Sequence, residues 1–394
     1  MRAIVLSGGG GKGAYQAGVY KAIKKLGIEY DIVTGTSIGA LNGFLMVQDD
    51  LFKCLWLWKH INYNKIFEDF NNVVDEKTLK NKYFEKIING GIDTKKIDKL
   101  VSRIYNPKRL YSSSIDYGVV AFDLAKLKPI VALKKEMDAS TLKKYIIASA
   151  TCFPVFKPQK YEKEVLVDGG YYDTTPINLA IDLGATEVVA VELKAVGLRK
   201  KVKNKDVKIT YITPNNDLTS FLVFEKEAAK KMIKFGYNDT MKVFKKFEGK
   251  KYTFKKNNLI NNYNKYSEDF VETTRYYVNQ NKSILKVLAK FNDVSYVINK
   301  QNIMKIMNKN LEELGNIFEL DESLIYDINS YNKILLRMLK KEPVVKIDVK
   351  KVLNRKALIK YIYSNLHENL SQATYNLICL FPKEFLMAIY LKVI

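Results

Sequence analysis

Tyr30–Met46, YDIVTGTSIGALNGFLM, is the stretch that decides the fold of this chain. Its first apolar residues predict a short strand, and Ala40–Met46 predicts the start of a helix. The turn between them, Gly35-Thr36-Ser37-Ile38-Gly39, has the G-x-S-x-G pattern of a nucleophile elbow, whose glycines let strand and helix pass closely while the serine hydroxyl stays exposed. Ser37 is therefore the first candidate for a catalytic nucleophile, although the bare five-residue pattern also occurs by chance in loops.

A second glycine-rich turn lies near the N-terminus. Ala3–Leu6 predicts a buried strand, the run SGGGGKG follows at Ser7–Gly13, and apolar residues then recur at helical spacing from Tyr15 to Leu26. Glycines at the start of a helix leave backbone N–H groups unblocked and add the positive end of the helix dipole. This turn is suited to holding an anion.

Two kinds of anion are compatible with this loop. The pattern Gly8-x-Gly10-x-x-Gly13 fits a dinucleotide fingerprint, whereas the phosphate-loop pattern fails because Gly13 stands where that pattern needs Ser or Thr. A dinucleotide fold also needs an acidic residue after the second strand to hold the ribose, but here that strand ends in the elbow. A glycine loop and an elbow on neighbouring strands favour the oxyanion of an ester hydrolysis intermediate.

The candidates for a base that activates Ser37 are few. The chain has two histidines: His60 lies in an aromatic helical stretch and His367 in a basic helical region. A Ser-His-Asp triad through His367 agrees with chain order but would have to reach across a separate helical segment. Asp168 is the better base, because EVLVDGG at Glu164–Gly170 places a carboxylate at the end of a strand, followed by two glycines that permit close approach. The alternative is an ordinary Asp-Gly turn.

The residues collected so far resemble the four ordered blocks of the patatin-like phospholipases. These blocks are GGGGKG at Gly8–Gly13, GTSIG at Gly35–Gly39, ASATCFP at Ala148–Pro154 and DGG at Asp168–Gly170. The resemblance extends through Pro176 and into a stretch from Glu225 to Tyr237 that is similar to the helix closing that domain. One departure is Asp173, where the family often has asparagine before the proline, which puts the support of the local loop in doubt.

The resemblance implies a lipid acyl hydrolase that works through a Ser-Asp dyad and an acyl-enzyme, without histidine, metal or cofactor. It implies Ser37 as the nucleophile and Asp168 as the proton acceptor. The implied oxyanion donors are the amides of Gly9, Gly10 and Gly11. The remaining motif positions, implied as support, are Gly8, Lys12, Gly13, Gly35, Gly39, Gly169 and Gly170. A lipid phosphate contact by Lys12 is less favoured than a solvated lysine in the first helical turn.

Length and patterning predict two regions. Residues 1–213 alternate apolar strands and helices, which predicts an α/β fold that the resemblance makes a patatin-like three-layer α/β/α sandwich. Within it, residues 51–112 carry apolar residues on helical faces and are expected to cap the site. Residues 214–394 predict a mainly helical, basic C-terminal region.

Charge is unevenly distributed along the chain. Residues 1–195 hold 28 Lys+Arg and 22 Asp+Glu, a net charge of +6, which leaves +17 of the total +23 for residues 196–394. Such a bias attracts anionic lipid surfaces, and no nucleic-acid motif accompanies it, so nucleic acid is not expected as a partner. The alternative is that the excess of lysine only reflects the composition of the genome. The apolar end of the chain, from Leu377 to Leu391, is expected either to lie in a membrane interface or to pack against the catalytic domain.

No signal peptide or bilayer-spanning run is visible, so the expected location is cytoplasmic, with peripheral membrane association. The three cysteines, Cys54, Cys152 and Cys379, lie in apolar surroundings and predict reduced core residues. Two functions remain open: a lipid acyl hydrolase of phospholipase A or lysophospholipase type, and a noncatalytic or nucleotide-binding regulator that retains the glycine loop. Head group, acyl position and activating partner are not specified by the sequence.

Overall fold

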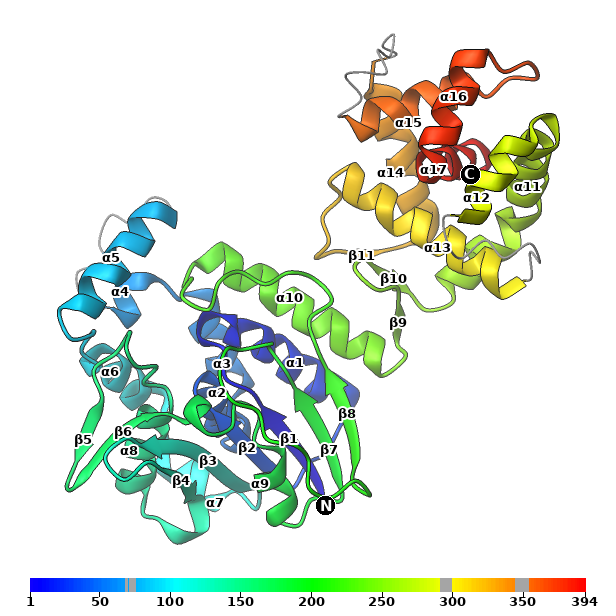
Figure 1. Ribbon diagram of the computed structural model, residues 1–394. Coiled ribbons are helices and arrows are strands. Elements are labelled where there is room, and N and C mark those ends of the chain that lie inside the picture. The colour runs from blue at the N-terminus through cyan, green and yellow to red at the C-terminus, as the bar shows by residue number, and fades with distance from the viewer. Residues whose placement is uncertain (68–69, 71–75, 291–299, 344–353) are drawn as a thin grey trace. The chain divides into compact units, whose positions relative to one another are not determined.

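A computed structural model of the chain describes residues 1–394 except 68–69, 71–75, 291–299 and 344–353 (Figure 1). It divides into two compact units, Met1–Val243 and Phe244–Ile394. The helices of the first unit are α1 Gly13–Leu26, α2 Ile38–Val47, α3 Leu51–Lys59, α4 Tyr63–Ile66, α5 Glu76–Ile88, α6 Lys95–Ile104, α7 Pro107–Ser112, α8 Ala139–Ser149, α9 Ile177–Asp182 and α10 Lys226–Val243, with short 3-10 turns at Gly10–Lys12, Lys134–Glu136 and Gly169–Tyr171.

The first unit is built on a mixed sheet of eight strands in the described residues. The strands are β1 Arg2–Leu6, β2 Ile32–Thr36, β3 Asp116–Asp123, β4 Lys128–Leu133, β5 Gln159–Tyr161, β6 Glu164–Asp168, β7 Glu187–Val191 and β8 Lys208–Ile212. Their order is β5-β6-β3-β2-β1-β7-β8, and β4 pairs with β3 outside this path. The five strands from β3 to β8 in that order run parallel, while β4, β5 and β6 form antiparallel pairs.

Helices cover both faces of the sheet, as the sandwich prediction requires. Alternate side chains of β1, β2 and β7 form one apolar cluster with α9, including Ala3, Ile32, Ile177 and Val188. The intervening side chains point to the opposite face, where α2 packs on β1, β2 and β3 and α8 packs on β3 and β6. The predicted α/β/α sandwich with a C-terminal helical region is confirmed.

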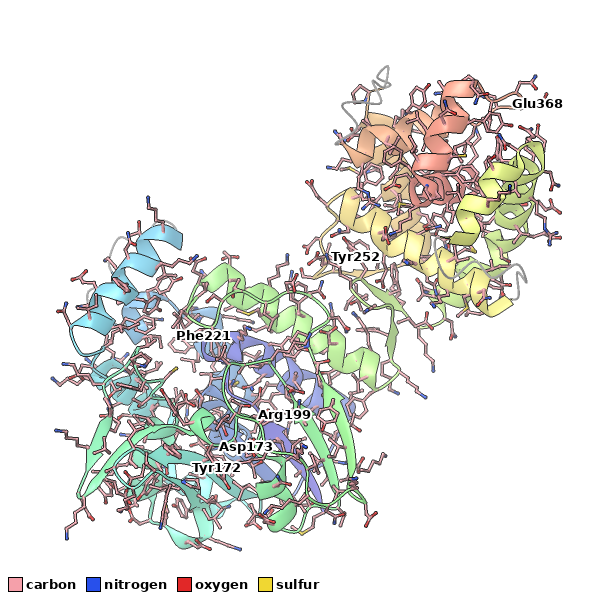
Figure 2. The ribbon with its side chains drawn as sticks, in the orientation of Figure 1. Tyr172, Asp173, Arg199, Phe221, Tyr252 and Glu368 are labelled. Carbon is pink, nitrogen blue, oxygen red and sulfur yellow. The ribbon has the colours of Figure 1, made fainter. Side chains whose placement is uncertain are left out.

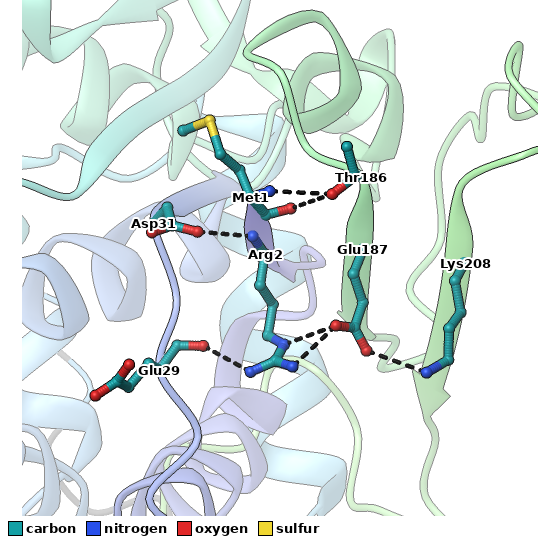
Figure 3. A network of polar contacts seen from close by, with 7 residues as sticks. All are labelled: Met1, Arg2, Glu29, Asp31, Thr186, Glu187 and Lys208. Atoms are coloured by element: carbon teal, nitrogen blue, oxygen red, sulfur yellow. Dashed lines mark hydrogen bonds and ion pairs between the residues drawn. The ribbon is translucent and has the colours of Figure 1, made fainter.

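The ends of the central strands opposite the elbow are joined by a polar network (Figure 3). Arg2 donates to Glu187 at 2.9 Å and, through its backbone N–H, to Asp31 at 2.8 Å, while Lys208 contacts Glu187 at 3.4 Å. Arg2 and Glu187, and Glu187 and Lys208, are register partners on adjacent strands. These partly exposed pairs are worth about 0–1 kcal/mol each, so they align the strand ends more than they stabilise the sheet.

The boundary between the units falls after α10, thirty residues beyond the predicted one at residue 213. The reason is the tight packing of α10 along α1, visible in Figure 1. A Cβ on Gly18 of α1 would lie 2.0 Å from the Ile233 carbonyl oxygen, and one on Gly236 of α10 would lie 1.9 Å from the Tyr15 carbonyl oxygen. Glycine at both crossing points lets the two backbones touch, which ties α10 to the first unit.

The second unit is mainly helical. Its elements are β9 Phe247–Glu248, β10 Thr253–Lys255, α11 Asn258–Gln280, α12 Lys282–Lys290, α13 Lys300–Ile317, β11 Ile325–Tyr326, α14 Ile328–Lys341, α15 Arg355–Ser364, α16 Gln372–Leu380 and α17 Pro382–Val393. Its core holds a buried polar triad in which Asn262 donates to the Tyr390 hydroxyl at 3.0 Å and Asn332 donates to Asn262 at 2.9 Å.

The apolar end of the chain packs into the core of the second unit itself, which is neither of the two expected positions. Leu377, Ile378, Phe385 and Ile389 are all buried in the core of the second unit itself. Leu380 is the large exposed apolar side chain of this stretch, with 58% of its surface accessible. A run of apolar residues on one helical face has the same pattern whether it packs on a protein core or on lipid. Among the residues described, none of the helices is both long enough and apolar enough to cross a bilayer.

Candidate active site

Ser37 lies at the turn from β2 into α2, and its backbone is in an unusual conformation. Its φ is 58° and its ψ is −126°, a conformation that non-glycine residues rarely adopt. The turn is tight on both sides: a Cβ on Gly35 would lie 2.4 Å from the Gly39 carbonyl oxygen, and one on Gly39 would lie 2.2 Å from the Leu6 carbonyl oxygen. Glycine is therefore needed at both positions, which is the geometry of a nucleophile elbow.

Asp168 ends β6, and its carboxylate accepts a hydrogen bond from the Gly170 N–H at 2.7 Å. Burial raises the pKa of this carboxyl from its ordinary value of 3.8 to about 6, although interactions with the Ser37 side chain and the Gly170 N–H oppose the rise. A carboxylate with this pKa is ionised at neutral pH and is a stronger base than an exposed aspartate. The structure thus brings together the two residues of the predicted dyad.

The strand register explains why Asp168 reaches Ser37. β6 runs antiparallel to β3, so the rule that ligand sites gather at the carboxyl ends of parallel strands does not apply to it. Thr36 pairs with Val120 on one side of β3, and Asp168 pairs with Ala121 on the other. Close approach also needs Gly169, because a Cβ there would lie 2.1 Å from the Val120 carbonyl oxygen.

Two N–H groups of the glycine loop are already bonded within the protein. The Gly8 N–H donates to the Thr174 carbonyl oxygen at 2.9 Å, and the Gly11 N–H donates to the Phe221 carbonyl oxygen at 2.7 Å. For the N–H groups of Gly9 and Gly10, no acceptor is found in the described part of the chain. Both glycines line the same cavity as Ser37 and have positive φ angles of 157° and 53°. Gly9 and Gly10 therefore retain free donors, whereas Gly11 is already bonded.

The other positions of the glycine motif have packing roles. Gly13 begins α1, and a Cβ there would lie 2.4 Å from Ile38 and 2.6 Å from Trp58. Lys12 is half-buried, and burial lowers its pKa, with a further contribution from the nearby charge of Lys194. Asp173, the departure from the family pattern, is labelled in Figure 2. It is buried, and its carboxylate accepts from the backbone N–H groups of Thr175 and Lys200. The aspartate thus supports its own loop.

An apolar cavity of about 530 Å³ opens beside the dyad. Ser37, Asp168, Gly9 and Gly10 are among the residues that line it. Its remaining wall is almost entirely apolar and draws on the 51–112 segment, on residues 152–156 and on the segment around Phe221, which Figure 2 labels. The 51–112 segment contributes Leu57, Trp58, Ile61, Ile66, Phe67, Ile97 and Leu100. A mainly apolar cavity that includes a few polar groups suits an apolar chain attached to a reactive polar group.

Neither histidine takes part in this arrangement of side chains. His60 is exposed at the end of α3, where its Nδ1 lies 2.8 Å from the Trp56 carbonyl oxygen and its ring stacks on Trp56. His367 is exposed in the second unit. Where the structure describes the chain, no group of three or more His, Cys, Asp or Glu side chains is arranged to hold a metal ion.

Sequence reasoning missed two parts of the site. Phe221 and Phe224 line the cavity from a loop that carries no motif, so no sequence signal identified them. Ser149 lies within the quoted block ASATCFP, but the pattern did not assign it a role. The structure places its hydroxyl 2.8 Å from the Ser37 backbone nitrogen.

Comparison with known proteins agrees with this geometry. Residues 4–181 match the family model for patatin-like phospholipases. Over 193 residues the chain is 27% identical to patatin-like phospholipase domain-containing protein 7 of Rattus norvegicus, and over 194 residues it is 27% identical to the corresponding protein 6 of Homo sapiens. It is 25% identical over 193 residues to lysophospholipase nte1 of Aspergillus terreus. These matches cover 48–49% of this chain but only 12–13% of the relatives.

Solved structures give weaker likenesses. VipD from Legionella pneumophila superposes with a TM-score of 0.41 at 14% identity, covering 99% of this chain and 90% of that chain. The type III effector protein ExoU superposes with a TM-score of 0.32 at 11% identity, covering 98% of this chain and 76% of that one.

Proposed function

Residues 4–181 belong to the patatin-like phospholipase family, and on that premise we propose that the chain is a lipid acyl hydrolase with Ser37 as nucleophile and Asp168 as proton acceptor. One observation carries this proposal. The side chain of Ser37 interacts with the buried carboxylate of Asp168, and both line an apolar cavity together with Gly9 and Gly10, whose backbone N–H groups are free within the described residues. Nucleophile, base, oxyanion donors and a chain-binding wall are the parts that ester hydrolysis needs.

In the first half of the reaction, Ser37 Oγ attacks the ester carbonyl carbon while its proton passes to the Asp168 carboxylate. The carbonyl oxygen becomes an oxyanion, which accepts hydrogen bonds from the N–H groups of Gly9 and Gly10. One such donor is worth roughly 2.7–4 kcal/mol of transition-state stabilisation in comparable sites. The intermediate then collapses, the ester C–O bond breaks, and the leaving alcohol takes the proton from Asp168. Gly11 is left out of this role because its N–H is bonded to Phe221.

In the second half, a water molecule attacks the acyl-Ser37 carbonyl and gives a proton to Asp168. Collapse of this second intermediate breaks the bond to Ser37 Oγ, returns the proton to that oxygen and releases the fatty acid. Asp168 ends each half-reaction in its starting ionisation state. A carboxyl group whose pKa is raised to about 6 is suited to this exchange near neutral pH.

For the substrate, we propose a fatty-acyl ester of a glycerolipid, cleaved in the manner of a phospholipase A or lysophospholipase. The apolar wall of the cavity supports an acyl chain, and the fungal relative is named a lysophospholipase. The excess positive charge beyond residue 196 supports attraction to anionic lipid surfaces. That attraction is electrostatic, since the apolar end of the chain is buried. Binding to anionic vesicles should therefore weaken as salt is raised, and salt-insensitive sedimentation with vesicles would contradict it.

The proposal is tested by fatty acid release from phosphatidylcholine vesicles and lysophosphatidylcholine micelles. Wild type should release fatty acid from at least one, and Ser37→Ala should release none while remaining folded. Ser114→Ala, an exposed serine in the same unit, is the matched control and should behave as wild type. An inert wild type that instead binds a nucleotide tightly would favour the regulatory alternative.

A further inference from the structure

Residues 149–151, at the end of α8 and just after it, contact the backbones of both dyad residues. Ser149, the last residue of α8, is fully buried, and its hydroxyl accepts a hydrogen bond from the Ser37 N–H at 2.8 Å. The same hydroxyl donates to the Val120 carbonyl oxygen at 2.6 Å. The one donor of the Ser149 hydroxyl and one of its two acceptor sites are therefore used within the protein.

Two residues further on, the chain holds the other member of the dyad. The carbonyl oxygen of Thr151 accepts from the Asp168 N–H at 3.0 Å. The Thr151 side chain donates to the Ile147 carbonyl oxygen at 3.0 Å, which ties this residue back to the last turn of α8. Three consecutive residues, 149–151, thus link the backbone of the nucleophile to the backbone of the base.

The link is significant because the elbow conformation is strained. Ser37 has a positive φ and belongs to a buried turn, so its N–H needs an acceptor inside the protein. Without an acceptor, rotation of this peptide toward another hydrogen-bond partner would lower the free energy of the turn. Such a rotation would move Ser37 Oγ away from the Asp168 carboxylate.

We propose that Ser149 is a positioning residue that holds the Ser37 peptide, and so sets the placement of Ser37 Oγ against Asp168 and the Gly9 and Gly10 donors. The inference rests on the proposed function for its catalytic consequence. It assigns a role to the ASATCFP block that the dyad and the glycine loop leave unexplained.

The first test is turnover per active site in Ser149→Ala, with active sites titrated by a fluorophosphonate probe. Misplacement of a nucleophile by a fraction of an ångström to about 1 Å costs up to about 100-fold, so kcat should fall roughly tenfold to 100-fold. KM should stay within about twofold, because the acyl-binding wall is untouched. Ser149→Thr keeps the hydroxyl and should restore much of kcat. If Ser149→Ala does not fold, Ser149→Cys tests the same claim, since a thiol is a weaker acceptor of similar size.

The matched control is Thr240→Val, which removes a buried hydroxyl hydrogen bond in the same unit, from Thr240 to the Gly236 carbonyl oxygen at 2.7 Å. A substitution that only destabilises the fold lowers the number of active sites that the probe can titrate, but it leaves turnover per active site at the wild-type value. Thr240→Val should show that result. Ser149→Ala with the same result would overturn the inference.

A second readout does not depend on activity. Amide hydrogen exchange at Ser37 should be faster in Ser149→Ala than in wild type or Thr240→Val, because the N–H has lost its acceptor. Unchanged exchange at Ser37 would overturn the inference. If wild type proved inert toward every ester, the proposed function would fail, whereas faster exchange in Ser149→Ala would still support Ser149 as the group that holds the elbow.

Discussion

Replacing the buried base Asp168 with asparagine should remove activity and, at neutral pH, stabilise the first unit. The wild-type carboxyl must ionise in a buried site, which raises its pKa from 3.8 to about 6. An asparagine has no charge to bury, keeps an oxygen that accepts from the Gly170 N–H, and occupies nearly the same volume. Asp168→Asn should therefore fold as wild type does while losing the proton acceptor.

The magnitude follows from the two pKa values. Below about pH 4 the carboxyl is protonated in both the folded and the unfolded chain, so its ionisation does not change the free energy of unfolding. As pH rises from about 4 to 6, the unfolded chain loses this proton first, so the free energy of unfolding of wild type falls. Above pH 6 the loss is complete and amounts to about 3 kcal/mol, at 1.36 kcal/mol for each pH unit between the two pKa values.

Urea unfolding followed by tryptophan fluorescence measures this difference in the first unit alone, because both tryptophans, Trp56 and Trp58, lie there. Asp168→Asn should be more stable than wild type by about 3 kcal/mol at pH 8, and the gap should close as pH falls toward 4. A gap that does not change with pH, or a variant less stable than wild type at pH 8, would refute the assigned burial and charge state of Asp168.

Three further outcomes are expected. His60→Ala and His367→Ala should each keep most of the wild-type hydrolysis rate, and loss of turnover in either folded variant would mean that the dyad is incomplete. The pH profile of kcat/KM should show an acid limb with an apparent pKa near 6, because the carboxylate form of Asp168 is the base; a profile flat from pH 5 to 8 would exclude that role. A chain ending at Val243 should unfold cooperatively by tryptophan fluorescence, whereas a chain ending at residue 213 lacks α10 and should not; equal folding of both would place the boundary earlier.

Most of the site could be predicted from the sequence because its parts are local. The elbow and the glycine loop are each one turn between a strand and a helix, and their glycines are required by contacts within a few residues or with the adjacent strand. The buried strand predicted at Ala3–Leu6 is also present as β1, since a short apolar run before a turn defines it. Asp168 was identified by its Asp-Gly-Gly turn.

The remaining features depend on contacts between distant residues, which no local pattern records. The antiparallel course of β6 and its register against β3 bring Asp168 to Ser37, and the bond between Gly11 and Phe221 spans more than two hundred residues of chain. The packing of α10 on α1 places the unit boundary after Val243 and not at residue 213, in agreement with the resemblance of Glu225–Tyr237 to a domain-closing helix. Likewise, burial of the chain's apolar end depends on tertiary packing, which the helical pattern alone does not distinguish from packing on lipid.

The most direct test of the Ser37–Asp168 dyad is mass spectrometry of the protein after reaction with a fluorophosphonate. We expect a single adduct on Ser37 in wild type, none in Ser37→Ala, and a much slower adduct in Asp168→Asn, because the hydroxyl has lost its base. Wild-type turnover with the adduct on another residue, or labelling of Ser37 at an unchanged rate in folded Asp168→Asn, would contradict the dyad.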